Sequence, residues 1–213
     1  MERFKYPSTA HLPFSQSVSE DDYTIAKEGL EFLQSGIELI VTEKMDGGNI
    51  SLYRDGFHSR SLDATSQHWD YRSKAEWAAR RFLIPEDIRL SGESMAARRS
   101  VGYENLPAAT ILFGAWREKA LLAWDEFTAL ANEAMLPTVP VLYRGTNFDD
   151  AVKAWRDSGR TEEDSEGFVI RYAGAIALED FPNRLGKWVR RNHVRTSADW
   201  RNRIDYELNG IVK

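Results

Sequence analysis

The sequence contains no cysteine among its 213 residues. Disulfide bonds, thiolate zinc sites and cysteine nucleophiles are therefore excluded. No stretch approaches the ~18 consecutive apolar residues that a membrane-spanning helix needs. The first residues are polar and include Pro7 and Pro13, unlike a secretory signal peptide. With 42% hydrophobic residues, we expect a soluble, cytoplasmic protein with one sizeable core or two small ones.

Negative charge slightly exceeds positive charge overall, but basic residues are concentrated in one segment. The net charge is −5 and the isoelectric point is about 5.5, which argues against nonspecific coating of nucleic acid. Residues 182–203, however, contain one acidic residue, Asp199, and seven basic ones. The basic residues are Arg184, Lys187, Arg190, Arg191, Arg195, Arg201 and Arg203. Such a segment forms either a solvated face or an anion-binding element, and its composition leaves both open.

Hydrophobic periodicity predicts helices and strands without regular βαβ alternation. Helices are expected over 25–33, 73–82, 125–135 and 149–155. Strands are expected over 38–42, 50–54, 57–61, 88–93, 110–116, 120–124, 139–143, 167–172 and 186–191. Ser73 and Asp125 are predicted helix caps, and Asp55-Gly56 predicts a hairpin turn. The pattern indicates an α+β fold with antiparallel sheets, in a single domain over residues 1–213.

A lysine stands between an aliphatic strand and a pair of glycines, in the sequence Thr42-Glu43-Lys44-Met45-Asp46-Gly47-Gly48-Asn49. Glycines at such a position let the backbone approach a ligand closely. Taken alone, the Lys-x-Asp-Gly pattern is weak, because many turns contain it. A solvated Lys44 beside an ordinary turn therefore stays open on this pattern alone.

Further charged or aromatic residues stand beside predicted strands later in the chain. They lie in Ser91-Gly92-Glu93, Ile111-Leu112-Phe113-Gly114, Glu166-Gly167-Phe168-Val169-Ile170-Arg171 and Lys187-Trp188-Val189-Arg190. Together with the Lys44 motif, this series resembles the covalent nucleotidyltransferases, which include ATP-dependent RNA and DNA ligases and mRNA capping enzymes. Within them the chain is most similar to a compact RNA ligase, and the segment Lys5-Tyr6-Pro7-Ser8-Thr9-Ala10-His11-Leu12-Pro13 adds to that similarity.

The resemblance implies a nucleotidyltransferase domain of the ATP-grasp-like ligase type, with antiparallel sheets flanked by helices and the active site between the sheets. It implies an ATP-dependent RNA ligase that joins 5′-phosphate and 3′-hydroxyl RNA ends, as in RNA repair, through lysyl-AMP and RNA-adenylate intermediates. Its cofactors would be ATP, with AMP carried covalently on Lys44, and Mg²⁺ or Mn²⁺. A related enzyme that joins DNA or uses GTP, and a noncatalytic nucleic-acid-binding relative, are the alternatives.

The resemblance also implies a role for each matching residue. Lys44, Lys187 and Glu166 would be catalytic, with Lys44 as the nucleophile. ATP or AMP would be bound by Glu43, Lys44, Asp46, Gly47, Asn49, Arg60, Glu93, Phe113, Glu166 and Lys187. Glu166 and Glu93 would bind the metal directly or through water. RNA would be bound by Arg190, Arg191 and Arg195.

Within this set, the implied contacts differ from residue to residue. Glu43 matches the residue that recognises the adenine amino group, and Phe113 matches the aromatic ring that stacks on adenine. Glu93 matches the glutamate that binds the ribose, and Arg60 matches an arginine that contacts ribose or phosphate. Lys187 matches a lysine at the α-phosphate.

Elementary chemistry explains why a lysine nucleophile needs cations near it. A free lysine has a pKa of ~10.4, so about one in 2,500 is neutral at pH 7. Nearby positive charge and desolvation lower the cost of removing its proton. Lys187, Arg60 and a divalent metal suit this role, and the same cations would stabilise charge that develops on the α-phosphate.

The sequence departs from the family pattern in two respects. Most ligases have a second lysine two residues after the one matched by Lys187, but here Val189 stands there and Arg190 and Arg191 follow. Either arginine can supply a cation, but neither can act as a proton donor. The tail 196–213 is also too short for the OB domain that follows in DNA ligases and capping enzymes.

Ordinary structural roles also remain open for these positions. Glu93 and Glu166 suit exposed strand ends, and Phe113 suits the core. Lys187 suits a basic surface. His11 is expected to be a packed or surface histidine and is given no catalytic role.

Overall fold

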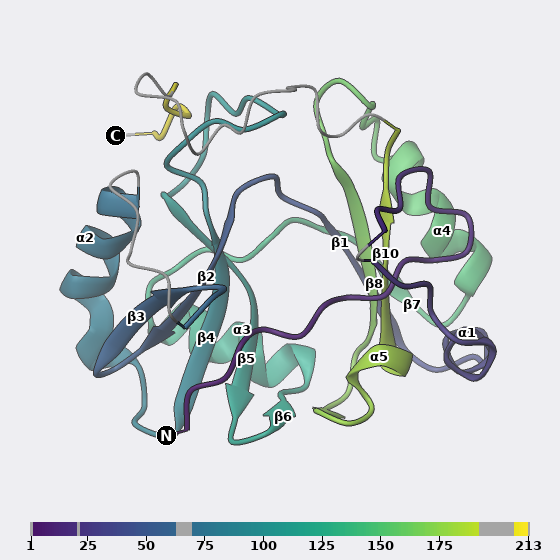
Figure 1. Cartoon of the computed structure of the whole chain (residues 1–213), viewed down its shortest axis with the longest axis horizontal. Coiled ribbons are helices and arrows are strands. Elements are labelled where there is room, and N and C mark those ends of the chain that lie inside the picture. The colour runs from purple at the N-terminus through teal and green to yellow at the C-terminus, as the bar shows by residue number, and fades with distance from the viewer. Residues whose placement is uncertain (1, 21, 63–69, 192–206, 213) are drawn as a thin grey trace. The chain divides into compact units, whose positions relative to one another are not determined.

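The computed structural model describes residues 2–20, 22–62, 70–191 and 207–212 (Figure 1). Arg195 and much of the basic segment 182–203 lie outside the described residues. The chain divides into two compact units, each built from segments distant in sequence. Unit 1 comprises Met1–Tyr6, Asp46–Thr138 and Thr196–Lys213, and unit 2 comprises Pro7–Met45 and Val139–Arg195.

Unit 1 is built on an antiparallel sheet. Its elements in chain order are β2 (Gly48–Tyr53), β3 (Gly56–Ser59), α2 (Tyr71–Arg80), the 3₁₀ turn η2 (Arg81–Leu83), β4 (Ile88–Ser94), β5 (Thr110–Arg117), β6 (Ala120–Leu121) and α3 (Trp124–Glu133). Strands β3, β2, β4, β5 and β6 pair in that order. Tyr53 pairs with Gly56 across the β2–β3 turn, which confirms the hairpin predicted at Asp55-Gly56.

Unit 2 is built on a second antiparallel sheet. Its elements are α1 (Lys27–Leu33), β1 (Leu39–Glu43), β7 (Val141–Gly145), α4 (Phe148–Asp157), β8 (Gly167–Tyr172), β9 (Ile176–Ala177), α5 (Phe181–Arg184) and β10 (Leu185–Val189). The strand order is β10-β8-β1-β7. Strand β1 therefore has a neighbour on each side, and all of its residues are buried. Both sheets together confirm the predicted α+β class.

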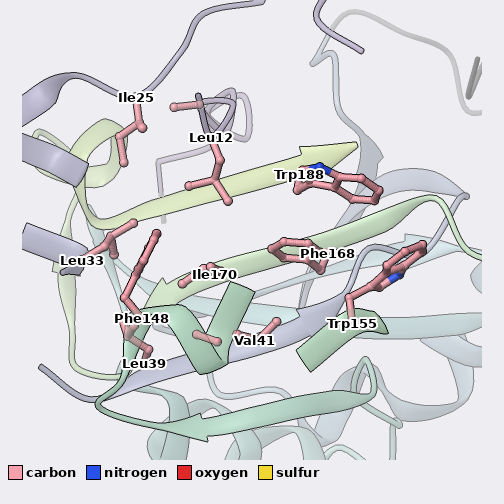
Figure 2. Close-up of a cluster of buried hydrophobic side chains, with 12 residues drawn as sticks. Leu12, Ile25, Leu33, Leu39, Val41, Phe148, Trp155, Phe168, Ile170 and Trp188 are labelled. Carbon is pink, nitrogen blue, oxygen red and sulfur yellow. The ribbon is translucent and has the colours of Figure 1, made fainter. Parts of the chain in front are cut away.

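The core of unit 2 lies where its sheet meets its helices (Figure 2). Sheet residues in this cluster are Leu39, Val41, Phe168, Ile170 and Trp188, and helix residues are Leu33, Phe148, Ala151 and Trp155. The rings of Phe168 and Trp188 stack at 5.5 Å between centroids, and Trp155 lies 5.0 Å from Trp188. Aromatic pairs at such distances add to the stability gained from burial. These side chains join strands β1, β8 and β10 to helices α1 and α4 in one core.

Helix starts are where the sequence predictions fail. Ser73 lies inside α2, whose N-cap is Asp70, and its buried hydroxyl interacts with Ser94 and donates to the Ala109 carbonyl. Asp125 is likewise in the first turn of α3, whose N-cap is Ala123. The segment 120–124, predicted as one strand, forms only the short β6 before α3 begins at Trp124. The short elements η2, β9 and α5 carry no periodic pattern, and the sequence did not predict them.

Candidate active site

The end of β1 positions Glu43 and Lys44 through backbone contacts on both sides. The Lys44 amide donates to the Gly167 carbonyl over 2.9 Å, and the Glu43 amide donates to the Pro140 carbonyl over 2.9 Å. Register pairing places Glu43 opposite Phe168 on β8. The nucleophile candidate is thus the first residue after a strand that the sheet fixes from both edges.

Lys44 and Glu166 form a close ion pair within unit 2. Lys44 Nζ donates to Glu166 Oε2 over 2.6 Å. The Glu166 side chain is 8% exposed and that of Lys44 is 27% exposed. Charge-assisted hydrogen bonds of this length are among the stronger ones in proteins. The structure therefore brings together two of the three catalytic residues that the sequence predicted.

The third, Lys187, lies on β10 and pairs with an aspartate that the sequence analysis did not select. Lys187 Nζ donates to Asp22 Oδ1 over 2.9 Å, and the Lys187 side chain is 16% exposed. Burial lowers the pKa of Lys187 below its usual range, and the charge of Lys44 lowers it further, whereas Asp22 and Glu166 raise it. The lowering of the Lys187 pKa by Lys44 indicates that the two ammonium groups repel each other.

Asp22 is itself held by several donors. The Ser19 hydroxyl donates to Oδ2 over 2.6 Å, and His11 Nε2 lies 3.3 Å from the same oxygen. Burial raises the pKa of Asp22, but the hydrogen bonds from Ser19 and Lys187 and the charges of Lys187 and His11 bring it well below its usual range. Asp22 is therefore a carboxylate at neutral pH. His11 is a packed histidine, as expected, but it faces this group.

Glu43 also has a partner that the sequence analysis missed. Arg160 Nη2 donates to Glu43 Oε2 over 2.7 Å, and the two side chains are 24% and 8% exposed. Arg160 lies in the segment between α4 and β8. A partly buried bond between guanidinium and carboxylate fixes the direction of both groups. Nothing local in the sequence around Arg160 indicates this contact.

The later residues of the Lys44 motif, Asp46 to Asn49, belong to unit 1 and contact other parts of it. Asp46 Oδ2 accepts hydrogen bonds from Ser100 Oγ over 2.6 Å and from the Val101 amide over 2.9 Å. Asn49 on β2 is the register partner of Glu93 on β4. A side chain at Gly47 would lie 2.7 Å from Glu93 Cγ and 2.6 Å from the Ser94 carbonyl oxygen. Gly47 is thus required by close packing against β4.

Phe113 and Arg60 occupy less regular positions of unit 1. On β4 the residues Ser91 and Gly92 pair with Gly114 and Leu112, so a bulge leaves Phe113 between two register positions. Such bulges redirect a side chain. The Phe113 ring is half-buried and packs edge-on against Tyr6 at 5.2 Å. Arg60 follows the end of β3 and its side chain is exposed.

The two predicted RNA-binding arginines that the structure describes differ in exposure. Arg190 is 1% exposed, and its amide donates to the Glu166 carbonyl over 3.1 Å. Arg191 is exposed, and its amide donates to Gln16. Arg191 is therefore the one whose side chain is accessible to a nucleic acid, whereas Arg190 lies inside unit 2.

For a metal, the described residues offer single carboxylates and no group of three or more His, Asp or Glu side chains. Glu166 belongs to unit 2 and Glu93 to unit 1. Magnesium is commonly bound by one or two carboxylates with substrate phosphates and water completing its shell. A buried Glu166 fits a site of that kind. Separately, none of the helices that the structure describes is long and apolar enough to cross a membrane.

Solved structures with a similar fold are ligases. A putative ATP-dependent DNA ligase from Aquifex aeolicus superposes with a TM-score of 0.53 and 17% identity, over 88% of this chain and 50% of its own. An RNA ligase from Naegleria gruberi, solved with pyrophosphate, gives 0.55 and 16%, over 91% and 63%. An archaeal ATP-dependent RNA ligase gives 0.55 and 16%, over 87% and 48%.

These likenesses define the class: the chain has the nucleotidyltransferase fold of ligases. Residues 37–189, well over half of the chain, match the model of the RNA ligase family, and the chain belongs to that family. No protein with a curated function matches it by sequence. The chain spans less than two thirds of the length of each solved ligase named above.

Proposed function

We propose that this chain is the adenylyltransferase domain of an ATP-dependent RNA ligase. It would join RNA 5′-phosphate and 3′-hydroxyl ends in three steps: adenylylation of Lys44, transfer of AMP to the 5′-phosphate, and attack by the 3′-hydroxyl with release of AMP. The observation that carries the proposal is the Lys44–Glu166 pair at 2.6 Å. It occurs within the segment that matches the RNA ligase family.

In the first step the Lys44 amine attacks the α-phosphorus of ATP. A P–N bond forms, the bond to the β-phosphate oxygen breaks, and pyrophosphate leaves. The ammonium must first give up a proton, and the Glu166 carboxylate at 2.6 Å is within reach to accept it. Lys187, on strand β10 beside β8, would stabilise the negative charge that develops on the phosphate oxygens.

A divalent metal would supply additional positive charge at the phosphates. A variant of the Naegleria gruberi RNA ligase has been solved with ATP and manganese. We propose that this chain also binds a divalent metal, with Glu166 as a ligand and Glu93 as a second one, directly or through water. Both are hard oxygen donors of the kind that Mg²⁺ and Mn²⁺ prefer.

Adenine recognition would depend on Glu43. Arg160 holds one of its carboxylate oxygens over 2.7 Å, and the other oxygen can accept the adenine amino group. Guanine carries a carbonyl oxygen at the matching position, which a carboxylate would repel. Asp46, Gly47 and Asn49, with Glu93, would surround the ribose and phosphates, Phe113 would stack on the base, and Arg60 would contact ribose or phosphate.

The RNA strand would be contacted by the exposed Arg191, together with Arg195. Phosphate neutralisation by arginine makes nucleic-acid affinity fall with salt. We therefore expect the affinity for RNA to decrease steeply as the salt concentration rises. An affinity that does not change with salt would remove the basis for this assignment.

Covalent capture of AMP tests the central claim. Purified protein is mixed with magnesium and labelled ATP, and the product is analysed on a denaturing gel and by mass spectrometry. We expect an AMP adduct on Lys44, and its loss in Lys44→Ala. The matched control is Lys153→Ala, which removes an exposed lysine of α4 in the same unit.

The same assay separates the alternatives. Labelling by GTP rather than ATP, or joining of DNA rather than RNA ends, would identify a related nucleotidyltransferase. No adduct with either nucleotide would contradict the proposed chemistry. An adduct that persists in Lys44→Ala would show that another residue is the nucleophile.

A further inference from the structure

Near Lys187 lies a polar cluster made of His11, Ser15, Ser19 and Asp22, all in unit 2. These residues precede the segment 37–189 that matches the RNA ligase family. Resting on the proposed function, we propose that Asp22 is a positioning residue that keeps Lys187 protonated and aimed for the α-phosphate, with His11 and Ser19 fixing the carboxylate.

The backbone brings Asp22 to Lys187 independently of their side chains. The Lys187 amide donates to the Ala10 carbonyl over 2.8 Å, and the Leu12 amide donates to the Lys187 carbonyl over 2.8 Å. The N-terminal segment therefore pairs with β10 on either side of His11. The His11 amide donates in turn to the Tyr23 carbonyl over 2.7 Å. Two sets of backbone hydrogen bonds therefore place Asp22 near Lys187. The first joins residues 10–12 to Lys187, and the second joins His11 to Tyr23, the residue after Asp22.

The carboxylate of Asp22 then divides its oxygens between separate donors. Oδ1 accepts from Lys187 Nζ over 2.9 Å. Oδ2 accepts from Ser19 Oγ over 2.6 Å and faces His11 Nε2 at 3.3 Å. Because each oxygen has its own donors, the plane of the carboxylate is fixed. The ammonium that it holds is fixed with it.

His11 is buried and oriented from its other nitrogen. Nδ1 lies 2.8 Å from Ser15 Oγ, which accepts a hydrogen bond from the Val189 amide on β10 over 3.0 Å. This arrangement lets the Ser15 hydroxyl donate to Nδ1, which puts the imidazole proton on Nε2, facing Asp22. Burial and the charge of Lys187 lower the pKa of His11, although Asp22 raises it. His11 Nε2 makes no hydrogen bond, so His11 supports the carboxylate by its contact at 3.3 Å and not as a donor.

Lys187 needs such support because its surroundings oppose its charge. Four titratable groups act in its neighbourhood: Asp22, His11, Lys44 and Glu166. Burial and Lys44 lower the pKa of Lys187, and Asp22 is the first of the groups that raise it. A neutral Lys187 would lose most of its attraction for a phosphate. Asp22 therefore acts against both burial and the nearby nucleophile.

Holding Lys187 does not block phosphate binding. A lysine ammonium has three N–H donors, and the bond to Asp22 uses one of them. The remaining donors can face a phosphate oxygen. The Asp22 carboxylate already restricts the conformations of the long Lys187 side chain. Less conformational entropy is therefore lost when Lys187 binds a phosphate.

The test compares wild type with Asp22→Asn, which keeps the size of the side chain but removes its charge. The first measurement is trace labelling with acetic anhydride across a pH series, with acetylation of Lys187 quantified by mass spectrometry. This readout reports the neutral fraction of the amine and needs no catalysis. Loss of an opposite charge at this distance shifts a pKa by about 1–3 units. We therefore expect Lys187 in the variant to react about tenfold or more faster near pH 8.

The second measurement is the rate of lysyl-AMP formation over the same pH series. In Asp22→Asn the alkaline limb should move to lower pH by about 1–3 units, while the rate at low pH changes little. Asp22→Glu should restore part of the wild-type profile. The matched control is Glu38→Gln, which removes a carboxylate from the exposed ion pair with Arg144 at 2.9 Å in the same unit. It should leave both measurements unchanged.

Unchanged labelling of Lys187 in Asp22→Asn would overturn the proposal whatever the enzyme does. If Asp22→Asn does not fold, Ser19→Ala decides, because it leaves the carboxylate in place but removes the hydrogen bond at 2.6 Å. It should change labelling in the same direction and by less, and no change would equally refute the role. Wild type without any lysyl-AMP would refute the proposed function alone, since the labelling result stands apart from it.

Discussion

Gly167 offers a sharp test of how the fold holds Lys44 and Glu166. Its φ is +150°, which side-chain-bearing residues rarely adopt, and a methyl group there would collide with the Trp188 carbonyl oxygen. Its own carbonyl accepts the Lys44 amide over 2.9 Å. Gly167 thus directly follows Glu166, is hydrogen-bonded to Lys44 and lies against Trp188 of β10. Gly167→Ala therefore strains the backbone at the point that positions Lys44 and Glu166.

The expected loss of stability follows from these two effects. An unfavourable φ costs about 1–3 kcal/mol, and a backbone shift that relieves the collision costs about 1–3 kcal/mol more. We therefore expect Gly167→Ala to lower the free energy of unfolding by about 2–6 kcal/mol. Gly36→Ala is the matched control in the same unit, because Gly36 has φ +80° but open space around it. It should lose only about 1–2 kcal/mol.

Urea unfolding followed by tryptophan fluorescence measures both variants, since Trp155 and Trp188 lie in the core of unit 2. Lysyl-AMP formation is then measured under conditions where each variant is folded. Gly167→Ala should be slower than Gly36→Ala, because the shift moves Lys44 relative to Glu166. Equal stability of the two variants would refute the reasoning from the collision, and equal rates would refute its link to the ion pair.

Three further predictions concern single side chains. Glu166→Gln should slow lysyl-AMP formation by about 10²-fold in single-turnover kinetics, because it removes the proposed proton acceptor of Lys44; an unchanged rate would contradict that role. The free energy of unfolding should fall as the pH drops below 6.5, because the unfolded chain binds a proton that the lowered pKa of His11 resists. Urea unfolding of His11→Gln should show a smaller slope with pH. Arg160→Gln should raise KM for ATP about tenfold, by loss of one charged hydrogen bond, whereas the exposed Arg156→Gln should not.

Local pattern predicted the elements whose determinants are local. The strand 167–172 was predicted with its observed bounds, because its apolar residues follow a glycine that breaks the preceding segment. The helix predicted over 25–33 ends at Leu33 as expected, and Gly36, with φ +80°, lies just past that end. Strand β1 was predicted one residue early, since a fully buried strand gives no alternation that marks its ends.

Features that depend on distant residues could not be predicted in this way. The residue type of Ser73 is typical of a helix cap. In the structure, however, its hydroxyl forms hydrogen bonds with Ser94 at the end of β4 and with Ala109 just before β5. Asp22 and Lys187 are separated by 165 residues, and Glu43 and Arg160 by 117. Only the folded sheet brings such pairs together. The resemblance to ligases carried Lys44, Glu166 and Lys187, whereas their supporting partners Asp22 and Arg160 had no motif to identify them.

The position of β1 in its sheet also bears on the order in which a ribosome delivers the parts. Both neighbours of this strand, β7 and β8, come from residues 141–172. At typical elongation rates these residues are made on the order of ten seconds after Lys44. A nascent chain therefore carries the proposed nucleophile Lys44 for that time without the two strands that pair with β1. Activity should arise abruptly, late in translation, and a chain stopped before residue 172 should be inert toward nucleotide.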